Sequence, residues 1–102
     1  MKVAILRAAR LDIQKCAQFW ERQEPGLGIE FIEYILSELD EVATLAGIHP
    51  KKGSYHRAVL QGRFPYYAVY YRIIEDIAEI VAIVDTRRDP KRIDNFLKRR
   101  LQ

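Results

Sequence analysis

Apolar residues recur at two different spacings along this chain, and the spacing changes near residue 51. Before that point they return every three or four residues, which is the period of an amphipathic helix. After it, β-branched and aromatic residues form short runs separated by turn-forming residues, as in antiparallel strands. The pattern therefore predicts a mainly helical first half and a sheet-forming second half.

The chain is expected to begin with a short strand and a helix. Residues 2–6, KVAIL, form an apolar run of strand length, and residues 7–23 change to helical spacing. Pro25 and Gly26, with Gly28 close behind, favour a turn, so this helix is predicted to end just before them.

A second helix gives the clearest periodic signal in the sequence. Its apolar residues repeat at three and four positions, while acidic residues occupy its other faces. Gly47 followed by Pro50 is a helix stop. Because only a short turn joins the two helices, we expect them to form an antiparallel hairpin. The predicted apolar face consists of Ile32, Ile35, Leu36, Leu39, Val42, Ala43 and Ala46.

The second half predicts a loop at KKGS, residues 51–54, and then three consecutive antiparallel strands. The turn-like sequences QGR and EDI separate these strands. Neighbouring strands in sequence are usually neighbours in space, so a three-stranded meander is expected. The strand candidates are YHRAVL at 55–60, PYYAVYYRII at 65–74 and IAEIVAIV at 77–84.

A final helix, PKRIDNFLKRR, is predicted to open at Pro90 with Asp89 as its N-cap. The whole order is strand, two helices, three strands and a helix. That order predicts an α+β fold with an N-terminal strand, an antiparallel helical hairpin, a three-stranded antiparallel meander and a C-terminal helix. The length of 102 residues suits one domain spanning residues 1–102.

Charge is distributed unevenly along the chain. The formal net charge is +3, but acidic residues gather in the helical half, and cations dominate from His49 to Arg72 and again after Thr86. Clustered Lys and Arg attract phosphate and carboxylate alike, so an anionic partner is expected, either nucleic acid or an acidic protein segment.

Other composition features narrow the class of protein. Cys16 is the only cysteine, which excludes a disulfide framework and a thiolate metal cluster. We expect no metal and no cofactor. The first ten residues lack the apolar core of a signal peptide, and no apolar run is long enough to cross a bilayer. A soluble protein of the cytoplasm, without a membrane partner, is therefore expected.

The tyrosine-rich stretch FPYYAVYYR, residues 64–72, contains four of the six tyrosines. Alternation along a strand places Tyr67 and Tyr71 on one face and Tyr70 and Arg72 on the other. The first face is expected to pack under the helices, and packing is the commonest use of any of these aromatic residues. Tyr70 with Arg72 is the exception, because a phenol beside a guanidinium can stack on a base and clamp a phosphate.

Further arginines are candidates for the same surface. Arg57 on the preceding strand, Arg63 before the tyrosine stretch, and Arg87 with Arg88 after the last strand can converge on the face of Tyr70. They would then form a cationic groove that binds a target or a partner. The alternative is a set of solvated surface arginines, and Arg87 and Arg88 can also pair with nearby acids.

Four segments together resemble the RelE/ParE family of type II toxin-antitoxin toxins, also called plasmid stabilisation proteins. The segments are ILRAARLDI, PGLGIEFIEYI, RFPYYAVYYRI and VDTRRDP, in the family's order and over nearly the whole chain. The resemblance implies a small bacterial toxin that inhibits growth and is held inactive in a hetero-oligomer by a cognate antitoxin, which wraps the toxin's sheet and groove.

The chain departs from the family pattern at two places. Asp85 stands where the family often has His, which weakens the local attraction for phosphate. The tyrosine stretch is one residue longer than the common form, with a doubled tyrosine at Tyr66 and Tyr67. A β-bulge at that position would absorb the extra residue.

The family implies two kinds of target, DNA gyrase or the ribosome with its mRNA. An endoribonuclease needs groups that transfer protons, which arginine cannot readily do, and His56 and Tyr70 are the weak catalytic candidates. No lysine lies between Lys52 and Lys91, so the strand-borne lysines of the nuclease branch are missing. The ParE-like branch, which inhibits DNA gyrase as a protein ligand, is therefore favoured. A RelE-like ribosome-dependent endoribonuclease and an inactive relative remain the alternatives.

Overall fold

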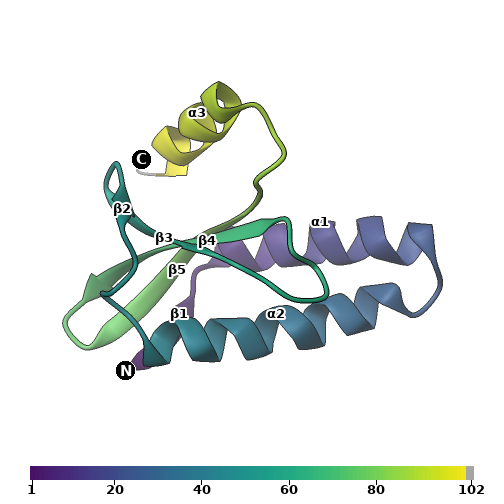
Figure 1. Ribbon diagram of the computed structural model, residues 1–102, viewed down its shortest axis with the longest axis horizontal. Coiled ribbons are helices and arrows are strands. Elements are labelled where there is room, and N and C mark those ends of the chain that lie inside the picture. The colour runs from purple at the N-terminus through teal and green to yellow at the C-terminus, as the bar shows by residue number, and fades with distance from the viewer. Residues whose placement is uncertain (101–102) are drawn as a thin grey trace.

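Three helices and a five-stranded mixed sheet make up the computed structural model, which describes residues 1–100 (Figure 1). The α+β class expected from the sequence is confirmed. None of the helices within this part of the chain is long and apolar enough to cross a membrane. The elements are β1 (Lys2–Ile5), α1 (Arg7–Gln23), α2 (Leu27–Thr44), β2 (Lys51–Lys52), β3 (Tyr55–Val59), β4 (Tyr67–Ile74), β5 (Ile77–Asp85) and α3 (Pro90–Arg100).

The sheet has the strand order β1-β5-β4-β3-β2, with β1 parallel to β5 and every other pair antiparallel. The three strands expected in the second half correspond to β3, β4 and β5. The prediction of a plain loop at 51–54 was wrong for its first two residues, because Lys51 and Lys52 pair with β3. Gly53 has a φ of 64°, the left-handed conformation that lets the chain reverse between β2 and β3.

The helical hairpin of α1 and α2 covers one face of the sheet, below it in Figure 1. Tyr67 and Tyr71 of β4 lie in the core between sheet and hairpin, as alternation predicted. Two residues of the predicted apolar face, Ile32 and Leu36, are not buried, since they are 36% and 45% exposed. These two residues lie at the margin of the apolar face of α2, and Phe31 fills the centre of that face instead.

A β-bulge is present, but it lies in β5 rather than at the doubled tyrosine. Tyr70 is opposite Ala82 and Tyr71 is opposite Ile80, so Val81 is the extra residue. As a result Val81 and Ala82 both join the core on the second face of the sheet, whereas Ile80 packs under the hairpin. Tyr66 stays exposed just before β4 begins.

Helix α3 packs on that second face, above the sheet in Figure 1. Ile93 and Leu97 are its buried residues, and they contact a core that includes Tyr70. The helix starts as predicted, because the Asp89 carboxylate accepts a hydrogen bond from the Lys91 N–H at 3.0 Å. This cap and the apolar stripe hold α3 against the sheet.

An ion pair between the buried Asp12 of α1 and the partly buried Arg100 of α3 closes the edge of β5. Strand β1 pairs with β5 only as far as Ile80, so the following part of that edge lacks a neighbouring strand. Asp12 accepts the Ile83 N–H at 3.0 Å, and Arg100 donates to the Val81 carbonyl at 2.6 Å. The two side chains also bond each other at 2.7 and 3.1 Å. A single pair thus anchors α3 to α1 through β5.

Candidate partner-binding surface

Tyr70 and Arg57 lie on the same face of the sheet, but Tyr70 does not face a partner. Its side chain is 1% exposed and belongs to the core under α3. Its hydroxyl accepts a hydrogen bond from Arg57 Nε at 3.0 Å. The expectation that Tyr70 stacks on a target base is therefore wrong: α3 occupies the space where a base would lie, and the phenol instead positions Arg57.

Arg72 and Arg63 are held by acids of this chain at two separate places. Arg72 Nε bonds Glu79 at 2.8 Å across β4 and β5, while Arg63 reaches Glu30 of α2 at 2.7 Å. Arg63 therefore faces the hairpin side of the molecule. Such exposed pairs contribute little to stability, about 0–1 kcal/mol, but they reduce the positive charge available to a partner. The predicted convergence of all the arginines on one groove does not occur.

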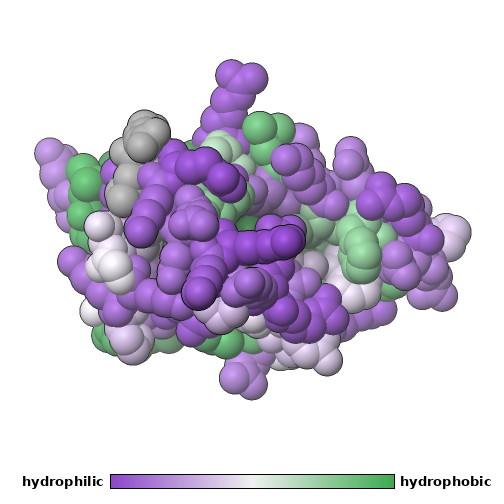
Figure 2. Space-filling view, turned by 90° about the horizontal axis from the view of Figure 1, so that it is seen from above, coloured by the Kyte–Doolittle hydropathy of each residue, from purple (hydrophilic) through white to green (hydrophobic). Residues whose placement is uncertain are grey.

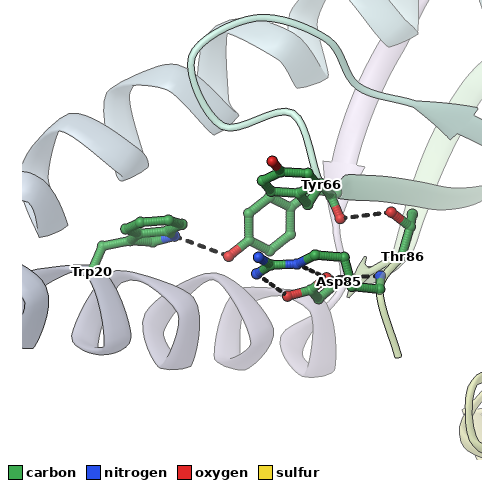
Figure 3. Close-up of polar contacts among 6 residues, drawn as sticks. Trp20, Tyr66, Asp85 and Thr86 are labelled. Carbon is green, nitrogen blue, oxygen red and sulfur yellow. Dashed lines mark hydrogen bonds and ion pairs between the residues drawn. The ribbon is translucent and has the colours of Figure 1, made fainter. Parts of the chain in front are cut away.

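Arg87 is bound on both sides at the end of β5, by Asp85 and by Tyr66, which Figure 3 labels. Its guanidinium bonds the Asp85 carboxylate at 2.8 and 3.1 Å and lies 4.3 Å from the centre of the Tyr66 ring. Thr86 fixes Tyr66 by donating its N–H and hydroxyl to the Tyr66 carbonyl. Asp85 therefore neutralises Arg87, which is the structural consequence of an acid at this position.

The Asp85 pair predicts a pH-dependent contribution to stability. The hydrogen bond from Arg87 lowers the pKa of Asp85. Because the pKa of Asp85 is lower in the folded protein than the unfolded value of about 4, the ion pair stabilises the folded state when the pH is above that unfolded value. This stabilisation is lost as the pH falls through the folded pKa of Asp85. We expect Asp85→Asn to lack this stabilisation. Urea unfolding at pH 7 and pH 3 should therefore show that the free energy of unfolding falls less on acidification in the variant than in the wild type. Equal losses in the two proteins would contradict the assignment.

His56 is a structural residue at the edge of the hairpin-side core. Its ring stacks on Tyr71 with centroids 5.0 Å apart, and its Nδ1 bonds the His49 carbonyl at 2.8 Å. His49 in turn bonds the Tyr71 hydroxyl through Nδ1, and burial lowers the pKa of His49. Register places His56 opposite Tyr71, so it has the opposite parity from Arg57. Neither catalytic candidate, His56 or Tyr70, accompanies an exposed arginine cluster.

An arginine groove lies instead between α3 and the end of β5. This hollow of about 670 Å³ is lined by Val84, Arg88, Asp89, Arg92, Ile93, Asn95, Phe96 and Arg99. Arg88, Arg92 and Arg99 are exposed, and within residues 1–100 no carboxylate lies within ion-pair distance of them. Figure 2, seen from above Figure 1, shows that the face carrying α3 is largely hydrophilic.

Sequence reasoning included Arg88 but missed Arg92 and Arg99. The available signal was the seven-residue spacing of Arg92 and Arg99, which places them on one side of the predicted last helix. Arg88 lies in the turn that precedes this helix. Phe96 lies half-buried in the same groove, beneath the Arg100 guanidinium at 4.3 Å. Guanidinium groups around an apolar floor suit an anionic ligand that also carries apolar groups.

Cys16 and Trp20 belong to the hairpin packing. The Trp20 indole N–H donates to the Tyr67 hydroxyl at 2.9 Å (Figure 3). Burial raises the pKa of Tyr67 to about 12 and also raises the pKa of the Cys16 thiol. Both groups are therefore neutral at physiological pH. Within the part of the chain that the structure describes, no three His, Cys, Asp or Glu side chains are grouped so as to hold a metal ion.

Comparison of the sequence with protein-family models and with curated proteins finds no match.

Proposed function

We infer that this chain is the toxin of a type II toxin-antitoxin system, acting in the ParE-like manner as a protein ligand that inhibits DNA gyrase. A cognate antitoxin neutralises it by covering the arginine groove. Two features support the proposal: the four segments that resemble RelE/ParE toxins, and the order of a strand, a helical hairpin, further strands and a basic helix.

The observation that favours a binding protein over a nuclease is the placement of the proton-transfer candidates. Tyr70 is buried under α3, and His56 is engaged by the His49 carbonyl on the other side of β3. Cleavage of RNA requires a base for the 2′-hydroxyl and an acid for the departing oxygen, both near the cations that stabilise the phosphorane. Neither candidate lines the arginine groove.

The groove has the chemistry of a surface that binds an acidic partner. Arg88, Arg92 and Arg99 present planar, permanently charged donors that suit bidentate contacts with carboxylates. Helix α2 lies on the opposite side of the sheet and contains acids but no cation. Because the two faces have opposite charge, a negatively charged partner is oriented toward α3 as it approaches.

Induced expression of the chain in a bacterium, followed by two assays on purified protein, tests this function. We expect growth to stop, gyrase supercoiling to be inhibited, and mRNA on translating ribosomes to stay intact. Unaffected supercoiling with mRNA cut on ribosomes would overturn the proposal in favour of the nuclease. Unaffected growth, supercoiling and translation would indicate an inactive relative.

A further inference from the structure

The outer edge of β3 is only partly covered. Arg57 donates its N–H to the Pro50 carbonyl at 2.9 Å, on the side of β2, whereas Leu60 donates to Tyr67 at 2.8 Å, on the side of β4. Backbone groups alternate between the two sides of a strand, so the N–H and C=O of Val59 point away from β4. The β2 pairing ends at Lys51 opposite His56 and does not reach Val59.

Strand β2 covers only the first part of the β3 edge and leaves Val59, within the described part of the chain, without a neighbouring strand on that side. Natural sheet edges are commonly guarded by lysine, proline or a covering segment. Lys51 and Lys52 guard the first part of β3, but Val59 is an apolar residue, 48% exposed, in an extended conformation. An uncovered apolar edge with free backbone groups is a template for another strand.

A cationic hollow lies on one side of this edge. It measures about 380 Å³ and is lined by His49, Pro50, Lys51, Lys52, Arg57 and Val59, with no acid among them. Among residues 1–100, Arg57 bonds a side chain only through Nε, to Tyr70, which leaves its terminal nitrogens for another acceptor. Side chains of an added strand that point to this side would therefore meet positive charge, and acidic residues suit that position.

The other side of the edge is apolar with an acidic rim. A hollow of about 420 Å³ separates β3 from the C-terminal half of α2, and Val42, Leu45, Ala58 and Leu60 contribute to its lining. Glu38 and Glu41 lie at the same hollow, and burial with the neighbouring Glu41 charge raises the pKa of Glu38. Apolar side chains suit this side, whereas acidic ones would be repelled.

We propose that the free edge of β3 at Val59 is a docking site for an extended segment of another protein, in which acidic and apolar residues alternate. The segment would pair with the Val59 N–H and C=O, place its acidic side chains toward Arg57 and Lys51, and place its apolar side chains toward Leu45. Alternation is the feature that matches the site, because successive side chains of a strand enter the two hollows in turn. The site is separate from the arginine groove and does not depend on the proposed function.

Titration of the isotope-labelled chain with synthetic peptides, followed by NMR, tests the docking site. The probe is a peptide that alternates glutamate and valine, and the expected result is a set of saturable amide shifts centred on β3 around Val59. A peptide that alternates lysine and valine should bind about tenfold more weakly, because its charge is reversed. The glutamate peptide with alternate backbone nitrogens methylated should not bind, because it keeps the side chains but loses the donors to β3.

A pair of protein variants provides the matched control. Val59 and Ile74 are both apolar strand residues, 48% and 47% exposed, but Ile74 lies at the far end of β4. We expect Val59→Glu to weaken the glutamate peptide about tenfold by repulsion, and Ile74→Glu to leave its affinity unchanged. The proposal is overturned by a lack of saturable shifts, by shifts centred on α3 or β1, by equal binding of the methylated peptide, or by equal effects of the two variants.

Discussion

Replacing Asp12 with alanine is expected to lower the free energy of unfolding by about 3 kcal/mol, the lower end of the range for removing one partner of a buried ion pair, because the Arg100 side chain stays 18% exposed. Asp12 is 8% exposed and accepts hydrogen bonds from Ile83 N–H and from two nitrogens of Arg100. Alanine leaves all of these donors without their acceptor. Urea unfolding followed by circular dichroism measures the change.

Two further variants make the Asp12 result specific. Asp12→Asn keeps an oxygen for the Ile83 N–H but removes the charge opposite Arg100, so its loss should be smaller than that of alanine. Asp40→Ala removes an exposed acid of α2 and should change stability by no more than about 0.5 kcal/mol. If Asp12→Ala also stays within that limit, the pair does not anchor α3 to the edge of β5.

Reversing the charge of the arginine groove is expected to abolish growth inhibition. The double variant Arg92→Glu/Arg99→Glu keeps α3 but turns two of the groove's exposed cations into acids. An acidic partner would then be repelled at the surface that attracts it in the wild type, and charge reversal in an interface is worth several kcal/mol. Viable counts after induction, together with gyrase supercoiling by the purified variant, measure the effect.

The same helix offers a control with an equal change in net charge. Lys91 and Lys98 neighbour the two arginines in sequence, yet neither lines the arginine groove. Lys91→Glu/Lys98→Glu alters the first and last turns of α3 just as the arginine variant does, so effects on helix stability are matched. Growth inhibition should survive in this control. Equal loss of inhibition in both double variants would mean that overall charge, rather than the groove, is responsible.

Much of the fold follows from local sequence pattern. The alternation of the tyrosine stretch correctly assigned Tyr67 and Tyr71 to a core face under the helices, and Asp89 with Pro90 correctly marked the start of α3. Such patterns are reliable because side-chain direction repeats every two residues in a strand and about every 3.6 residues in a helix. Periodicity also identified the apolar face of α2, but it does not say how far a neighbouring element covers a helix, and Ile32 and Leu36 of that face stay exposed.

The candidate site was less accessible to prediction. Arg57 lies beside Tyr70 on one face of the sheet, but strand alternation carried no information that α3 would cover that face and bury the phenol. The arginines form ion pairs with acidic residues at very different sequence separations. Arg87 pairs with Asp85 two residues away, whereas Arg63 pairs with Glu30 from a different element. The first kind of pair is visible in the sequence, and the second depends on packing.

The order of residues was sufficient to specify the elements, their approximate ends and the face to which most side chains point, because each depends on interactions within a few residues along the chain. Tertiary packing decided which surfaces remain available. It brings Asp12 into contact with Arg100 and buries Tyr70. It also leaves Arg92, Arg99 and the edge of β3 at Val59 exposed. These outcomes depend on which groups distant in sequence meet and on which edges stay unpaired, and local periodicity does not encode either.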